Sequence, residues 1–240
     1  MKLTNEMDSK NVVESELIVK ANVEKYDDVY RSGYDKKYPT LDLVRLEGWF
    51  FNKQPGKVLD FACGTGVNLI HMIDCGYTGV GVDASDESIK LVQKKIDSHP
   101  SIASKCKVIK LDPKQSKLPF DDNEFDYIIA MSILSLLESK ERIRTLVDEF
   151  HRILRPMGKM IIDINGPSGD FAQKGKYIDD DTFEYVLRSN QKEPITLYCP
   201  KTKEIFARIL ERFSIDDLGH TSFGYCGKHD YEFIACVHKP

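Results

Sequence analysis

The sequence contains no long uncharged apolar run, and residues 1–20 mix charges with short apolar stretches. A helix needs about 20 apolar residues to cross a bilayer, so we expect neither a membrane span nor a targeting signal. The cysteines form no C-x-x-C pair and no Cys/His cluster with zinc spacing; they stand at positions 63, 75, 106, 199, 226 and 236. We therefore expect reduced thiols in a cytoplasmic protein without a metal site.

An excess of charge of either sign is also absent. The 240 residues carry 34 Lys and Arg against 38 Asp and Glu, for a net charge of −4. So weak a field does not hold a polyanion at physiological salt, and the basic stretches at 105–110 and 201–203 lack the aromatic spacing of a base-stacking surface. We expect a small-molecule partner, with no nucleic acid and no membrane.

No Gly/Ser/Pro-rich linker or internal repeat divides the chain, so its organisation follows from apolar periodicity. Short apolar runs alternate with segments of helical spacing, a pattern typical of a parallel sheet covered on both faces. The predicted helices are 67–75, 86–96 and 139–154, and the predicted strands are 57–61, 78–82, 107–111, 127–131 and 159–164. The sequence thus predicts one doubly wound α/β domain, for which the chain is long enough.

The last forty residues have a different pattern. A predicted helix at 201–212 is followed by apolar runs at 213–217 and 231–238, with a glycine-containing connection between them. A parallel pair would need a crossover of a dozen or more residues, usually with a helix. We therefore predict an antiparallel terminal hairpin, which places His220 and His229 in its loop.

The segment VLDFACGTG, residues 58–66, places Gly64 and Gly66 where the first strand turns into a helix. Residues without Cβ atoms let a ligand approach the backbone closely. A dinucleotide fingerprint would have a third glycine three residues after the second, but that position is Leu69. Asp60 at the strand end would repel a pyrophosphate and attract an ammonium or a sulfonium. The pattern favours a cationic ligand, which leaves a nicotinamide oxidoreductase as a weaker alternative.

A second carboxylate, Asp83, ends the next strand seventeen residues after Gly66. A carboxylate in this place can bind both hydroxyls of a ribose. S-adenosylmethionine carries a sulfonium, an ammonium and a ribose. The two acids on consecutive strand ends therefore point to this ligand.

Four blocks in this order resemble the class I S-adenosylmethionine-dependent methyltransferases: VLDFACGTG, GVDAS (81–85), LPFDDNEFDYIIAMSILSLL (118–137) and RILRPMGKMII (152–162). The resemblance implies a Rossmann-like, mostly parallel seven-stranded sheet with a C-terminal antiparallel hairpin, and S-adenosylmethionine as cofactor. The residues it implies around the cofactor are Asp60, Ala62, Cys63, Gly64, Gly66, Asp83, Ala84, Ser85, Asp112, Met131 and Ser132.

By the same resemblance Asp112 lies near the adenine amine, while Met131 and Ser132 flank the transferred methyl group. The stretch between Asp112 and Leu118 is longer than the resemblance leads us to expect. The adenine contact can therefore shift to Leu111 or Pro113.

The sequence indicates the acceptor half of the reaction only weakly. Methyl transfer depends mainly on alignment, with a base required for some O or N acceptors. The candidates for that base are Asp163 and Asn165, beyond the fifth strand, and the loop residues His220 and His229. The aromatic stretch 26–38 is a candidate lid, with Tyr30 and Arg31 toward the cofactor.

These features divide the single domain into an N-terminal helical lid (1–54), a cofactor-binding core (55–165), a substrate cap (166–200) and a terminal helix with hairpin (201–240). We expect O- or N-methylation of a small polar molecule or a sugar. A non-catalytic S-adenosylmethionine-binding sensor or scaffold, and an aminopropyl-type transferase, are the alternatives because fold does not fix chemistry.

Overall fold

The structure is a computed structural model that describes residues 22–137, 139–173, 175–180, 182–185 and 195–240. The predicted lid before residue 22 and the part of the predicted cap at 186–194 lie outside the described residues. Within them, no helix is long and apolar enough to cross a membrane.

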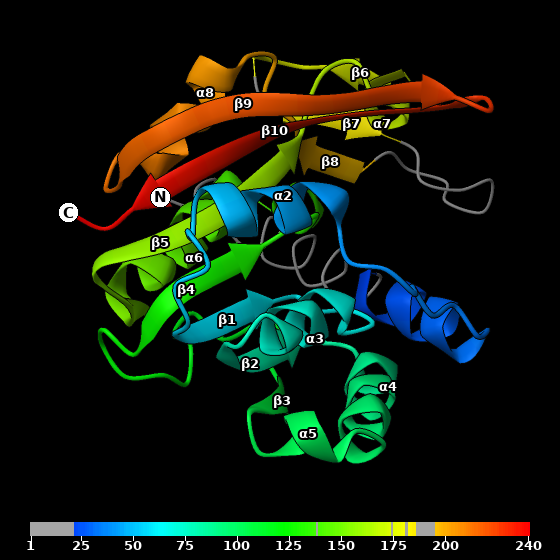
Figure 1. The fold of residues 1–240 in the computed structure, drawn as a ribbon. Helices are drawn as coiled ribbons and strands as arrows, with labels where there is room; N and C mark the ends of the chain where they lie inside the picture. Colours follow the sequence, from blue (N-terminus) through cyan, green and yellow to red (C-terminus); the bar gives the residue numbers. More distant parts are fainter. Residues whose placement is uncertain (1–21, 138, 174, 181, 186–194) are drawn as a thin grey trace, which may run out of the picture.

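A seven-stranded sheet of order β3-β2-β1-β4-β5-β10-β9 forms the centre of the molecule (Figure 1). The first five strands in this order pair in parallel, whereas β10 pairs antiparallel with both of its neighbours, β5 and β9. This confirms the predicted Rossmann-like sheet with its terminal hairpin. The strands are β1 (Lys57–Phe61), β2 (Thr78–Asp83), β3 (Cys106–Lys110), β4 (Phe125–Ala130), β5 (Leu154–Asn165), β9 (Ser214–Tyr225) and β10 (Lys228–His238).

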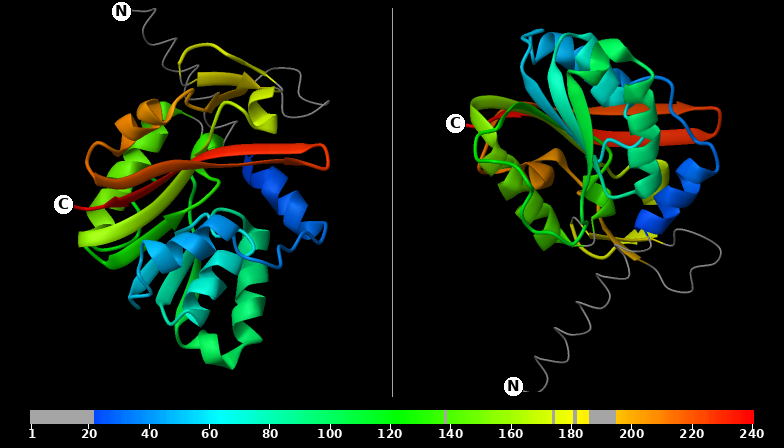
Figure 2. Two further views of the ribbon diagram at one scale, coloured as in Figure 1. Left: turned by 45° about the horizontal axis from the view of Figure 1, so that its top comes forward. Right: turned by 90° about the horizontal axis from the view of Figure 1, so that it is seen from below.

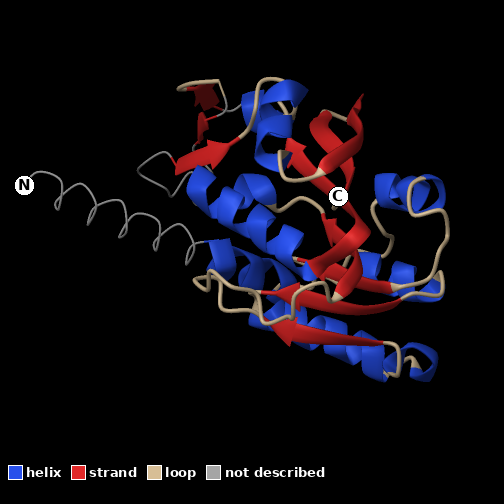
Figure 3. Cartoon of the chain, turned by 90° about the vertical axis from the view of Figure 1, so that its left-hand side faces the viewer, coloured by secondary structure: helices blue, strands red, loops and turns tan. Residues whose placement is uncertain are grey.

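Helices cover both faces of the sheet (Figure 3). Side chains of α6 such as Phe150 join the apolar cluster on one face, and Leu43 of α2 and Met72 of α3 join the cluster on the other. Strands buried on both sides need continuous apolar runs, which is why the sequence predicted them. The helices are α2 (Leu41–Trp49), α3 (Val67–Asp74), α4 (Asp86–Asp97), α5 (Pro100–Ala103), α6 (Lys140–Ile153) and α8 (Lys203–Ala207), with the short 3₁₀ helices η1 (Leu134–Leu136) and η2 (Arg208–Leu210).

Serine side chains fix where two of these helices begin. The Ser85 hydroxyl accepts a hydrogen bond from the Ser88 N–H at the start of α4, and Ser139 does the same for the Arg142 N–H at the start of α6. A capped first turn sets the angle at which the chain leaves the strand end. The loops that precede both helices are thereby held at the carboxyl edge of the sheet.

The terminal hairpin is much longer than predicted. Its strands are joined by Cys226 and Gly227 alone, with φ of 55° and 68°, as in a tight two-residue turn. The predicted loop is wrong, because His220 lies in β9 and His229 in β10. Most β9 residues are exposed, so β9 lacks the alternation of apolar and polar residues by which strands are recognised.

Residues after β5 form a second, smaller sheet (Figure 2). Its order is β6-β7-β8 and its pairs are antiparallel. The elements are α7 (Asp170–Gln173), β6 (Gly175–Tyr177), β7 (Thr182–Tyr185) and β8 (Ile195–Tyr198). The role of this segment as a substrate cap stays a prediction.

Candidate functional site

A cavity of about 390 Å³ lies at the carboxyl ends of the parallel strands, where open α/β sheets bind ligands. Its volume falls in the range of small-molecule sites. It is lined by the helix at residues 22–31, by the glycine loop and by the segments after β2, β3 and β4. Those of the predicted cofactor residues that line it are Tyr30, Ala62, Cys63, Gly64, Asp83, Ala84, Ser85, Asp112, Met131 and Ser132.

The glycine loop bends sharply between β1 and α3. Ala62, Gly64 and Gly66 have φ of 58°, 52° and 75°, in the left-handed region that glycine tolerates best. A Cβ on Gly66 would stand 2.8 Å from a methyl of Val92, so this glycine allows α4 to pack against the loop. Gly66 itself does not line the cavity; it holds the loop in place.

Asp83 is held on both sides by backbone N–H groups. The Gly64 N–H donates to Oδ2 at 2.8 Å, and the Ser85 N–H donates to Oδ1 at 2.9 Å. Each carboxylate oxygen can accept a second hydrogen bond. Burial raises its pKa, and hydrogen bonds from Ser85, Gly64, Ser88 and Ala84 oppose that shift. Asp83 lines the cavity, where a carboxylate can accept hydrogen bonds from a ligand.

Three tyrosines form a row along the cavity. Tyr26 and Tyr30 lie in the helix at residues 22–31, and Tyr34 follows its end. The Tyr26 and Tyr30 ring centroids are 6.2 Å apart, and those of Tyr30 and Tyr34 are 6.5 Å apart. The Tyr30 hydroxyl would be 2.9 Å from a Cβ on Gly64. Burial and the nearby Asp83 raise the pKa of Tyr30, so it stays a neutral hydrogen-bonding group.

Two cations line the cavity, Lys36 and Arg142, and the predicted Arg31 is not one of them. Arg31 is largely exposed and pairs with Asp28 at 2.8 Å and with Glu87 at 3.8 Å. It is not among the lining residues, whereas Lys36 is. Lys36 was missed because it lies between helices, where periodicity gives no signal.

Asp60 lies behind the glycine loop, only 2% exposed, and does not line the cavity. Its Oδ2 has no hydrogen-bond partner among the described residues. Burial raises its pKa to about 7, with a smaller opposing effect of Lys36. A cation in the cavity would favour its ionised form.

The segment after β3 forms the far end of the cavity. Leu111, Asp112, Pro113 and Gln115 line it, together with Arg142 of α6. One Arg142 nitrogen, Nη2, donates to the carbonyl oxygens of Pro113 and Gln115, at 2.9 and 2.6 Å. Gln115 and Arg142 are not predicted as site residues from the sequence, since neither their burial nor their contact follows from local spacing.

Asp163 supports the cavity wall from behind. The Ser132 N–H donates to its Oδ1 at 2.5 Å, at a residue whose φ is 58°. Asp163 is fully buried, and its Oδ2 has no partner among the described residues. Burial and the nearby Glu232 raise its pKa. Asn165 contacts the same segment, because its N–H donates to the Ser135 hydroxyl at 3.2 Å.

Glu232 of β10 stands opposite Asn165 and is a diagonal neighbour of Asp163 on the same sheet face. Burial and the nearby Asp230 raise its pKa to about 7. A partly protonated carboxyl group therefore lies next to the wall of the cavity, though it does not line it.

The two histidines proposed as bases lie on the hairpin. The His220 ring stacks on Tyr231, with centroids 5.1 Å apart and planes at 12°, and His229 lies near the hairpin turn beside Gly224. Neither lines the cavity.

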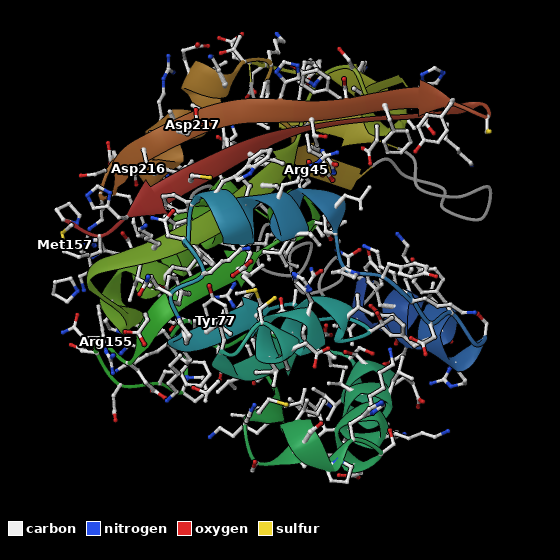
Figure 4. The ribbon with its side chains drawn as sticks, viewed as in Figure 1. Arg45, Tyr77, Arg155, Met157, Asp216 and Asp217 are labelled. Atoms are coloured by element: carbon white, nitrogen blue, oxygen red, sulfur yellow. The ribbon has the colours of Figure 1, made fainter. Side chains whose placement is uncertain are left out.

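Figure 4 shows the end of the sheet away from the helix at 22–31. Asp216 and Asp217 lie there at the start of β9, with Arg155 and Met157 below them.

Acidic and sulfur side chains do not gather for metal binding in the part of the chain that the structure describes. No group of three or more His, Cys, Asp or Glu residues there is arranged to hold a metal ion. The side chains that line the cavity supply carboxylates, amides, hydroxyls, a thiol, a thioether, one lysine and one arginine.

Comparison with known proteins gives a family for the core. Residues 58–158 match a family model described as a methyltransferase domain. The putative methyltransferase YqeM of Bacillus subtilis is 26% identical over 171 residues, which cover 67% of this chain and 65% of that protein. The tRNA N(3)-methylcytidine methyltransferase Mettl2 of Drosophila melanogaster is 27% identical over 142 residues, or 54% of this chain and 42% of that protein. The chain thus spans less than two thirds of the length of either relative.

A solved structure extends the likeness over most of the chain. The 1,6-didemethyltoxoflavin-N1-methyltransferase of Burkholderia thailandensis, with bound 1,6-didemethyltoxoflavin and S-adenosylhomocysteine, superposes with a TM-score of 0.68 at 15% identity. The match covers 94% of this chain and 90% of that chain. At such an identity the likeness shows a common fold.

Proposed function

We propose that this chain, which belongs to the class I S-adenosylmethionine-dependent methyltransferases, transfers a methyl group to an oxygen or nitrogen of a small polar molecule or a sugar. The observation that carries the proposal is Asp83, whose carboxylate is fixed by two backbone N–H groups at the mouth of the glycine loop. A carboxylate that lines the cavity at this strand end can accept from the two hydroxyls of a ribose.

The other lining residues fit the remaining parts of S-adenosylmethionine. Lys36 would pair with its carboxylate, and Asp112 would accept from the adenine amine. Asp60, with its unpartnered oxygen, would favour the positive charge of the ligand without touching it. When bound, the cofactor supplies a methyl group on a positively charged sulfur.

The contribution of the chain is alignment and the exclusion of water. Ser132, held by Asp163, fixes the backbone at the end of β4, where the methyl group would meet its acceptor. The tyrosine row covers the glycine loop from the opposite side. Holding two reactants in line lowers the barrier by avoiding the entropy cost of their encounter.

A small acceptor suits the volume of the cavity and the net charge of the chain. The likeness to the tRNA methyltransferase of Drosophila covers 54% of this chain, and a shared cofactor core does not carry the acceptor with it. Methylation of tRNA is therefore the acceptor alternative that an assay must include.

A second function, binding of S-adenosylmethionine without turnover, is favoured by one observation. None of the described residues that line the cavity is a histidine, and Asp163 is sealed from it. A sensor or scaffold would need the cofactor residues alone. Turnover of any acceptor excludes this alternative.

Titration calorimetry tests the donor half first. We expect S-adenosylmethionine and S-adenosylhomocysteine to bind and NAD, at equal concentration, not to bind. Transfer of a labelled methyl group to small-molecule fractions and to bulk tRNA then separates the acceptor alternatives. Failure of both sulfur ligands to bind a folded sample contradicts the proposal.

A further inference from the structure

The loop between β3 and β4 is fixed in a way that restricts how it can meet a ligand. The carbonyl oxygens of Pro113 and Gln115 both accept from Nη2 of Arg142, at 2.9 and 2.6 Å. Two bonds to one rigid guanidinium hold the loop against α6. The residues that line this end of the cavity therefore stand in set positions.

The backbone of this loop has little left to donate. Pro113 has no N–H, the Lys114 N–H donates to Oδ1 of Asp112 at 2.9 Å, and the Gln115 N–H donates to the Asp112 carbonyl at 3.1 Å. None of the three residues after Asp112 can thus offer a backbone donor to a ligand. A donor at this end of the cavity has to come from a side chain.

The Gln115 side chain is placed to be that donor. Gln115 lines the cavity, and its Nε2 is buried without a hydrogen-bond partner among the described residues. A buried amide N–H without an acceptor is costly. The last side-chain torsion of glutamine is broad, so the amide can turn to offer Nε2 to a ligand in the cavity.

Asp112 supplies the complementary acceptor. Its Oδ1 receives the Lys114 N–H, and Asp112 is one of the residues that line the cavity. An acceptor at Asp112 and a donor at Gln115 match the adenine edge, on which the 6-amino donor lies beside the N1 acceptor. Hypoxanthine presents the reverse order, with an oxygen acceptor at position 6 and a donor at N1.

We propose that Gln115, acting together with Asp112, reads this edge of the cofactor base and determines the specificity of the chain for adenine. The inference rests on the proposed function, because it concerns the same cavity. It assigns the base contact to a side chain that neither the strand ends nor the glycine loop indicates.

Titration calorimetry with S-adenosylhomocysteine and its deaminated analogue S-inosylhomocysteine tests the inference. The wild-type chain should prefer the adenosyl ligand by at least about tenfold, as expected for one matched donor and acceptor. Gln115→Glu replaces the donor by an acceptor, so the preference should shift toward the inosyl ligand. Gln115→Met has a similar shape and no donor, and should bind the adenosyl ligand about tenfold more weakly than the wild type.

Gln93→Glu is the matched control, because Gln93 is an exposed residue of α4 that bonds Asp97 and does not line the cavity. Its preference should equal that of the wild type. Wild-type preference in both Gln115 variants would overturn the inference, as would a wild type that does not discriminate. Failure of the wild type to bind either ligand would instead overturn the proposed function. Should Gln115→Glu fold poorly in a melting curve, Gln115→Met decides.

Discussion

The Ser85 hydroxyl donates to Oδ1 of Asp27 at 2.5 Å, and this contact ties the helix at residues 22–31 to the start of α4. The Glu87 N–H donates to the same oxygen at 3.2 Å. Although burial opposes it, these hydrogen bonds hold the pKa of Asp27 below its usual value. Ser85 also caps α4, so one side chain orders both the helix and the tyrosine row above the cavity.

Asp27→Ala should therefore loosen the helix that carries Tyr26 and Tyr30. We expect the affinity for S-adenosylhomocysteine to fall about threefold to tenfold, the range of an ordinary intramolecular hydrogen bond. Calorimetry measures the affinity, and hydrogen exchange of residues 22–31 measures the loosening. Asp28→Ala is the control, because Asp28 is exposed and pairs with Arg31. Equal effects of the two substitutions would refute the role of Asp27.

Asp83→Ala should weaken cofactor binding by on the order of 2 kcal/mol or more, because the ribose loses a charged acceptor. Two backbone donors, at Gly64 and Ser85, lose theirs as well. Asp86→Ala is the matched control, since Asp86 is an exposed acid of α4 paired with Lys110. An unchanged dissociation constant for S-adenosylhomocysteine in Asp83→Ala would remove the ribose assignment.

Gly64→Val should abolish binding and lower the melting temperature. Gly64 has φ of +52°, and a Cβ there would stand 2.9 Å from the Tyr30 hydroxyl. A β-branched residue is strained in the left-handed region. Gly219→Val is the control, because nothing lies within 4 Å of its Cβ position. Normal cofactor binding by Gly64→Val would place the ligand in another part of the molecule.

Glu232 gives the chain a predictable dependence on pH. Its pKa is raised from 4.5 to about 7 by burial and by Asp230 and Asp42. The folded state therefore holds a proton that the unfolded state releases. The stability linked to this group is complete below pH 4.5 and is lost as the pH rises to about 7.

Glu232→Gln removes this dependence. At pH 8 the variant should be more stable than the wild type, by on the order of 2 kcal/mol, and at pH 4.5 the two should be alike. Urea denaturation at both pH values measures the difference. Glu211→Gln is the control, because Glu211 is an exposed residue after η2. Its stability relative to the wild type should be the same at both pH values. A constant difference between Glu232→Gln and the wild type would contradict the prediction.

The sequence predicted those parts of the fold that depend on local pattern. β1 and β2 are continuous apolar runs because both of their faces are buried, and Asp83 follows from its place at a strand end. Lys36 and Gln115 lie in connections, where position depends on tertiary contacts such as that of Arg142 with the Gln115 carbonyl. No spacing rule reports such contacts.

For two histidines the sequence predicted a loop where the structure has strands. His220 and His229 were predicted in a loop because polar residues and glycines surround them. The continuous pairing of β9 with β10 keeps both histidines in extended conformation, although most of β9 is exposed. Backbone hydrogen bonding thus prevailed over composition, and neither histidine lines the cavity.

The position of β10 between β5 and β9 has a consequence for biosynthesis. β10 follows all other strands in the sequence, yet it fills an interior place in the sheet. A nascent chain that has reached α8 therefore contains every segment of the ligand cavity while the edge of β5 is still unpaired. Open strand edges recruit other chains, so until β10 has been translated the free edge of β5 can pair wrongly with another strand.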